Sequence, residues 1–249
     1  MDKLDLWKKA ANLRKQFGED ATSPIDIFAL ANSIERLSMV FYPMGNHISG
    51  MCIRSDNNNV IAINSSMSIG RQRFTIAHEV FHLYYDDQLT SICAKSIGTG
   101  KDKENEADQF ATYLLMPPDA LTNMIKDVKK NEADRLSIKD IVRLEQHFGV
   151  SRQAILFRLL EEKEITQQEA DPMRLGVIWS AVCLGYDDTL YKPLPVEKQY
   201  MTYGFYIRLA NEIFSKGLIS NGKYEELLLS AYRSDLVYGN EIEGGELID

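Results

Sequence analysis

The run His78-Glu79-Val80-Phe81-His82 is an HExxH motif, and its residue types at this spacing point to metal chemistry. On a helix, residues four apart lie about 40° from one another around the axis, so both imidazoles can bind the same ion. Glu79 lies about 100° from His78, beside such an ion and able to accept a proton from an attacking water. We therefore predict that His78 and His82 bind Zn²⁺ and that Glu79 is the general base.

The helix predicted over residues 69–85 must position this motif. Apolar side chains cover most of its circumference, and the polar residues of the motif share the remaining sector with Thr75. A helix this apolar is expected to be buried, and buried ionisable groups need partners. The competing interpretation is a satisfied pair of core histidines, or a polar stripe facing solvent. The coincidence of two ligands with a glutamate at the position of the base favours the metal site.

A catalytic zinc ion takes three protein ligands and keeps one open position. His47 and His147 are candidates for the third ligand, but Glu104 is favoured over both. Glu104 and Asp108 are four residues apart and share a helix face, whereas Glu106 points about 160° away. We therefore predict Glu104 as the ligand rather than Glu106, with Asp108 accepting the outer N–H of a ligating histidine. The alternative is a solvated acidic helix start that complements the helix dipole.

Composition limits the class of protein. The chain has 249 residues, of which 45% are hydrophobic and 26% charged, and it contains no apolar run of the roughly 18 residues needed to cross a membrane. The net charge of −8 disfavours nonspecific nucleic-acid binding by the whole chain. Three cysteines far apart argue against a disulfide framework. The charged N-terminal helix pattern is unlike a signal peptide, so we expect a cytoplasmic protein.

The pattern of elements predicts an α+β fold that is mostly helical and contains a small antiparallel sheet. The region 86–103 is expected to be a polar loop, and 173–236 mostly helical. Strands are predicted near 38–42, 50–53 and 60–63. Helices are predicted over 3–17, 69–85, 104–116 and 119–130. Another helix is predicted to begin at Ser23-Pro24, with Ser23 as its cap, and a pair of helices is predicted on either side of Gly149.

Two segments resemble the ImmA/IrrE family of metallopeptidases. They are Arg71–His82, which contains the HExxH motif, and Glu104–Pro117, which contains Glu-x-Glu-Ala-Asp and Leu-Leu-Met-Pro. The resemblance extends over about residues 1–165. It implies a gluzincin-like fold and an endopeptidase that cleaves a helix-turn-helix repressor, derepressing phage, mobile-element or stress genes.

Carried over motif by motif, the resemblance implies zinc ligands at His78, His82 and Glu104 and a base at Glu79. Asp108 departs from the family, in which Asn is common. Aspartate preserves a hydrogen-bond acceptor there, so the assignment stands.

Other features of the active site are open to more than one interpretation. The oxyanion needs a hydrogen-bond donor besides zinc, and helical angles favour Tyr85 over Tyr84, Tyr113 and His47. A tyrosine that covers the core with its hydroxyl in water is the alternative. Val60–Asn64 is predicted either as an edge strand that pairs with an extended substrate or as an ordinary sheet strand.

Residues 137–160 resemble a helix-turn-helix with its turn at Gly149-Val150. Five bases against two acids over 135–160 permit DNA contact, with Arg152 and Arg158 as the bases on which that interpretation depends. A packed helical pair is favoured. The alternative function is a DNA-binding or repressor-sequestering regulator with a structural zinc site.

The sequence predicts three parts. They are a zincin-like metallopeptidase domain over 1–132, a helix-turn-helix-like helical segment over 133–170, and a helical C-terminal region over 171–249 that ends in an acidic tail at 241–249. The expected partner is a protein substrate, with DNA not favoured and no membrane.

Overall fold

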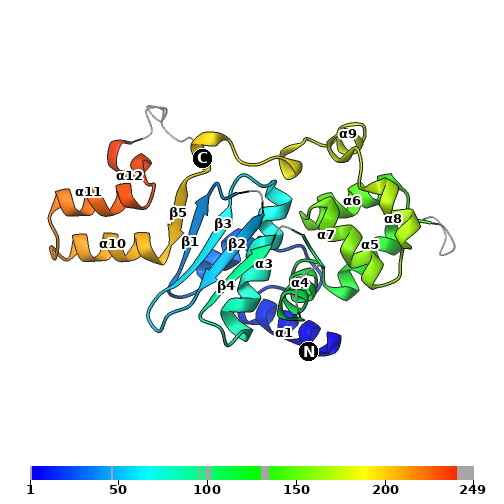
Figure 1. Cartoon of the computed structure of the whole chain (residues 1–249), viewed down its shortest axis with the longest axis horizontal. Helices are drawn as coiled ribbons and strands as arrows, with labels where there is room; N and C mark the ends of the chain where they lie inside the picture. Colours follow the sequence, from blue (N-terminus) through cyan, green and yellow to red (C-terminus); the bar gives the residue numbers. More distant parts are fainter. Residues whose placement is uncertain (1, 46, 95, 99–101, 130–134, 240–249) are drawn as a thin grey trace.

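A computed structural model of the chain shows an α+β fold built on one five-stranded sheet with helices packed against it (Figure 1). The structure describes all residues except 1, 46, 95, 99–101, 130–134 and 240–249. The tail predicted at 241–249 therefore lies outside the described residues. Among the described helices, none combines the length and apolar character that a membrane span requires.

The elements follow one another as labelled in Figure 1. The first part of the chain forms α1 (Lys3–Gln16), α2 (Ile27–Ser33), β1 (Leu37–Tyr42), β2 (Ile48–Ile53), β3 (Asn59–Asn64), α3 (Ile69–Tyr85), β4 (Thr90–Ala94) and α4 (Asp102–Leu115). The second part forms α5 (Pro118–Val128), α6 (Ile138–Phe148), α7 (Arg152–Glu161), α8 (Gln167–Met173), α9 (Val177–Val182), two 3₁₀ turns (Thr189–Tyr191 and Val196–Lys198), β5 (Met201–Gly204), α10 (Phe205–Ser215), α11 (Asn221–Ser230) and α12 (Ser234–Tyr238).

The sheet is mixed, not antiparallel as expected. Its strand order is β4-β2-β3-β1-β5, and β1 runs parallel to β3 while the other pairs are antiparallel. The parallel pair arises because β2 and β3 form a hairpin, and β1 pairs with β3 instead of its sequence neighbour β2. Since β3 lies between two strands, both of its backbone edges are used. Of the two interpretations of Val60–Asn64, the ordinary sheet strand is therefore the one observed.

Both edge strands, β4 and β5, fall where the sequence predicts no strand. β4 lies in the region expected to be a polar loop, and it pairs with β2. β5 lies in the region expected to be mostly helical, and it pairs with β1. Each is short and is held by a partner far away in the sequence, so its local pattern carries little signal.

The helix α3 packs against β2 and β3 on one side and against α4 on the other, and α1 packs against α4 in turn. This layering surrounds α3 with protein, as its apolar circumference requires. One hydrophobic core extends from Leu6 to Ala170, across the expected boundary at residue 132. A smaller cluster of Ile207, Leu228 and Ala231 joins α10 to α11. The three-part division of the chain stays a prediction.

Local signals explain the ends of two helices. α2 begins later than the Ser23-Pro24 cap predicted, because the Asp26 side chain accepts hydrogen bonds from the backbone of Phe28 and Ala29. Gly149 ends α6 with a φ of 63°, a left-handed conformation that glycine adopts without strain. The predicted turn between the two helices is thus confirmed.

Candidate metal centre

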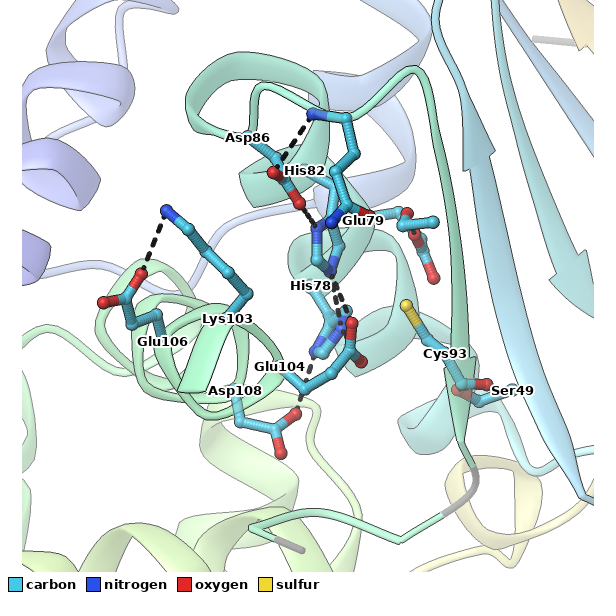
Figure 2. A network of polar contacts seen from close by, with 12 residues as sticks. Ser49, His78, Glu79, His82, Asp86, Cys93, Lys103, Glu104, Glu106 and Asp108 are labelled. Carbon is cyan, nitrogen blue, oxygen red and sulfur yellow. Dashed lines mark hydrogen bonds and ion pairs between the residues drawn. The ribbon is translucent and has the colours of Figure 1, made fainter. Parts of the chain in front are cut away.

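The HExxH motif lies on α3, which spans residues 69–85 as predicted. His78, Glu79 and His82 are all buried, with exposed fractions of 5%, 0% and 2%. The helix holds them between the sheet and α4, so that side chains from α4 and β4 approach the same point (Figure 2). Burial of three ionisable groups in one turn requires partners for each of them.

Ligand atoms from α3 and α4 converge at this point. The Nε2 atoms of His78 and His82 lie 3.2 Å apart. One carboxylate oxygen of Glu104 lies 3.3 Å from Nε2 of His78, and the other lies 3.4 Å from Nε2 of His82. The structure therefore brings together the three residues predicted as metal ligands.

The outer ring nitrogens are held by two carboxylates. Nδ1 of His78 lies 2.8 Å from Asp108, as predicted, and the second oxygen of Asp108 accepts the backbone N–H of Gly98. Nδ1 of His82 lies 2.7 Å from Asp86, a residue that the sequence analysis missed. The spacing of four residues between His82 and Asp86 was the available signal. Because a carboxylate only accepts hydrogen bonds, each Nδ1 carries a proton, and Nε2 is the atom that would offer its lone pair to a metal.

The two Nε2 atoms and the Glu104 carboxylate thus face one another in a buried space, an arrangement that fits a cation. Burial lowers the pKa of His78, but its hydrogen bonds to Asp108 and Glu104 outweigh this effect and raise that pKa to about 10. Burial raises the pKa of Glu104, yet its contacts with His78 and His82 bring it well below the usual range. Both shifts have the direction expected where carboxylate oxygens surround imidazole rings, which favours positive charge at this point. The donor set fits a divalent metal, and imidazole with carboxylate is typical of zinc.

A fourth ligand-type atom belongs to the same group. The sulfur of Cys93, on β4, lies with the ligand atoms of His78, His82 and Glu104 so that all are within 4.8 Å of one another. Burial and the neighbouring carboxylates of Glu79 and Glu104 raise the pKa of the Cys93 thiol. The sequence analysis did not single out this cysteine, because β4 was expected to be a loop.

Glu79 lies beside the ligand atoms and is fully buried. One of its oxygens accepts a hydrogen bond of 3.3 Å from the Ser91 hydroxyl, and the other, Oε1, has no hydrogen-bond partner among the residues that the structure describes. Gly50 on β2 leaves room for this oxygen, since a Cβ there would lie 3.0 Å from it. Burial raises the pKa of Glu79. A carboxylate with one free oxygen beside the cluster is suited to accept a proton.

The structure does not bring Tyr85 or Glu106 to the cluster. The Tyr85 hydroxyl donates to the backbone carbonyl of Lys9 on α1, at 3.3 Å. Tyr85 shares the helical angle of His78 but is seven residues further on, about 10 Å along the axis, which the angle alone ignores. This position gives no support to its role as oxyanion donor, which stays a prediction. Glu106 points toward Lys103, with 3.4 Å between the charged atoms, in agreement with the preference for Glu104.

The helix-turn-helix-like pair α6–α7 buries the two arginines on which DNA binding would depend. Arg152 forms an ion pair with Glu145 and donates to the Ser180 hydroxyl at 2.9 Å. Arg158 is fully buried, with its guanidinium 4.2 Å from the ring centre of Tyr113. Neither side chain can reach a phosphate or a base edge. These positions support the packed helical pair and weaken the DNA-binding alternative.

Comparisons with known proteins identify a likeness over the same region. Residues 38–160 match the IrrE N-terminal-like domain family, and this segment contains every residue of the cluster. The chain is also similar to the radiation response metalloprotease IrrE of Deinococcus deserti, with 30% identity over 105 residues. That alignment covers 40% of this chain and 36% of the relative, so the chain spans about a third of the length of the curated protein that it matches.

Proposed function

Because residues 38–160 form a domain of the ImmA/IrrE metallopeptidase family, we propose that this protein is a zinc-dependent endopeptidase of limited specificity. The observation that supports this most strongly is the convergence of His78, His82 and Glu104, with both outer ring nitrogens occupied by carboxylates. Two imidazole nitrogens and one carboxylate are a donor set of the kind that holds a catalytic zinc ion.

The proposed chemistry divides between the metal and the chain. A zinc ion held by His78, His82 and Glu104 would act as a Lewis acid toward the scissile carbonyl and make water a better nucleophile. Glu79 accepts the proton of the attacking water on its free oxygen and then passes it to the leaving amine. Asp108 and Asp86 hold the two imidazoles in the tautomer that this role requires.

The strand β4 is the natural place for a substrate backbone. It is an edge of the sheet, and its residue Ser91 contacts Glu79. An extended peptide that adds to such an edge would place a peptide bond beside the base. The side chains of Leu89 and Ile92 are 68% and 60% exposed there and offer apolar contacts to it. This role replaces the one predicted for Val60–Asn64.

The substrate that we propose is a helix-turn-helix repressor, as the family resemblance implies. The three cysteines, Cys52, Cys93 and Cys183, are free thiols, which agrees with the reducing cytoplasm where a repressor is found. We assign α6–α7 to support of the protease domain, because its arginines are buried.

The substitution Glu79→Gln tests the proposal. It retains size and hydrogen bonding but removes the proton acceptor, so cleavage should fall by about 10²–10⁴-fold while the bound metal stays. Cleavage is read as new amino termini in a peptide library by mass spectrometry, and metal content by elemental analysis. Glu106→Gln is the matched control, since it makes the same change outside the cluster.

A second arm uses purified helix-turn-helix repressors from the same genome. The Glu79→Gln variant should bind its cognate repressor and leave it intact, whereas the wild type cleaves it. Equal cleavage by both proteins, with metal retained, would contradict the proposal. Equal derepression in cells by both, without cleavage, would instead establish sequestration of the repressor.

A further inference from the structure

The edge strand β4 presents a cysteine to the metal centre. Cys93 is 1% exposed, and its sulfur lies within 4.8 Å of each of the ligand atoms of His78, His82 and Glu104. Figure 2 shows its side chain approaching from the sheet, opposite the helix that carries Glu104. Sulfur, imidazole nitrogen and carboxylate oxygen are the three donor types that zinc takes in proteins.

The strand geometry fixes this position. Cys93 pairs with Gly50 on β2, next to a register shift between Ile48 and Gly50. Such bulges redirect side chains at the edges of sheets. The Ser49 hydroxyl also donates to the carbonyl of Cys93, at 3.3 Å. Backbone pairing, the bulge and this hydrogen bond together aim the sulfur at the cluster.

The neighbouring cysteine shows what a buried cysteine without this role looks like. Cys52 is equally buried and lies on β2, two residues from Gly50 on the same face. Its sulfur is not among the converging ligand atoms. Cys52 therefore behaves as a small packing residue, which is the usual role of a buried thiol. Cys93 differs from it by position alone, and that makes Cys52 a matched control.

We propose that Cys93 is a fourth metal ligand, which completes the set of His78, His82 and Glu104 and makes this form of the protein latent. The inference rests on the proposed function, because it assumes that these three residues hold a metal. On binding, the S–H bond of Cys93 breaks, the sulfur keeps the electron pair and the proton leaves to solvent. Structural zinc sites have four protein ligands, whereas catalytic ones keep a position open.

The protein would be latent because Cys93 takes the coordination position that a catalytic zinc site keeps open for water. A thiolate in the fourth position would occupy the place of the water from which Glu79 takes a proton. Cleavage then requires that the Cys93 sulfur leave the metal, by rotation of its side chain or by loss of the thiol, while β4 keeps its place as an edge of the sheet.

The test replaces the native metal by cobalt(II) in the full-length protein, since a cobalt–thiolate bond gives a charge-transfer band in the near ultraviolet. The wild type should show this band. Cys93→Ser and Cys93→Ala should both lose it while still binding cobalt, with an affinity lowered by about tenfold or more. Cys52→Ser should keep the band and the affinity. Cleavage of the peptide library should rise in both Cys93 variants.

The outcomes separate this inference from the proposed function. If the wild type binds cobalt without a charge-transfer band, Cys93 is not a ligand. The same conclusion follows if the band disappears in Cys52→Ser but not in the Cys93 variants. In both cases the peptidase proposal is unaffected. If cobalt binds neither the wild type nor His78→Ala, both proposals are overturned. Retention of the band in both Cys93 variants would also contradict the assignment.

Discussion

Among the described residues, two buried clusters of charged side chains differ in whether each contains charges of both signs in contact. In the cluster between α6 and α7, Arg152 supplies the cation, Glu145 the anion, and the Tyr191 hydroxyl donates to Glu145 at 2.8 Å. In the cluster between α3 and α4, carboxylates and imidazole lone pairs converge, and one oxygen of Glu79 has no hydrogen-bond partner. The first cluster pairs its charges within the chain, whereas the second could hold a metal ion.

The comparison teaches that residue types alone do not separate structure from function. Both clusters attract attention in the sequence, one as HExxH and the other as a basic helix-turn-helix pattern. The two clusters differ in whether a charged side chain meets a side chain of opposite charge from the same chain. Arg152 meets Glu145 in the same helical pair, whereas the histidines meet only acceptors. A buried cluster with an excess of acceptors is therefore the better indicator of a binding site.

The largest predicted effect on stability comes from Arg152→Ala. Removing the guanidinium leaves Glu145 buried without its cation, so the free energy of unfolding should fall by about 3–5 kcal/mol. Metal content should stay unchanged. Urea unfolding measures the loss, and the double variant Arg152→Met with Glu145→Met should recover much of it because no charge is left unpaired. A loss below about 1 kcal/mol would mean that the ion pair is not what holds α6–α7 together.

A smaller effect is predicted for the carboxylates that orient the imidazoles. Asp108→Ala or Asp86→Ala should lower metal affinity by about 10–100-fold, because the ring loses the acceptor that fixes its tautomer. Asp108→Asn keeps an acceptor and should retain more of the affinity. Chelator competition measures the change, with exposed Asp87→Ala as the control. Equal affinities of Asp87→Ala and Asp86→Ala would show that Asp86 does not support His82.

The pH dependence of the chelated protein should also distinguish the two clusters. The pKa of His78 is raised from 6.5 to about 10 in the folded protein, so the folded state holds a proton that the unfolded state has lost. This contribution is complete below pH 6.5 and is lost as pH rises to about 10. Stability should fall by at most about 1.4 kcal/mol per pH unit in that range.

Urea unfolding of the chelated protein at several pH values measures this slope. His78→Ala should flatten it, whereas Arg152→Ala should leave it unchanged because a guanidinium keeps its proton throughout the range. A stability that rises with pH in the wild type between these limits would contradict the charge balance of the metal centre.

The smallest effects are predicted at the exposed bases of α6. Lys139 and Arg143 face solvent. Replacing either one by alanine should therefore change the free energy of unfolding by less than about 0.5 kcal/mol. Peptide cleavage should be unchanged. Retarded migration of a DNA duplex by the wild type, lost in this double variant, would revive the DNA-binding alternative.

The sequence predicts the local part of the site well. The helical range of α3, the shared face of its histidines and the choice of Glu104 over Glu106 all depend on spacing within single helices. Helical periodicity determines such relations directly. The helical angle of Tyr85 does not predict its position, however, because the angle ignores the rise along the axis, and its hydroxyl contacts Lys9 on α1.

What the sequence does not predict depends on contacts between distant segments. Cys93 reaches the cluster only because β4 pairs with β2, and the parallel pairing of β1 with β3 is likewise nonlocal. The burial of Arg152 and Arg158 was also invisible, since a count of charges does not show which of them face inward. Strand pairing and burial are set by the whole fold, so short patterns leave them open.

The central claim is that His78, His82 and Glu104 hold one metal ion. Elemental analysis of protein purified without chelator measures it most directly. We predict about one zinc ion per chain in the wild type and in Glu106→Ala, and little in Glu104→Ala. If Glu104→Ala stays fully loaded while Glu106→Ala loses its zinc, the ligand assignment is wrong.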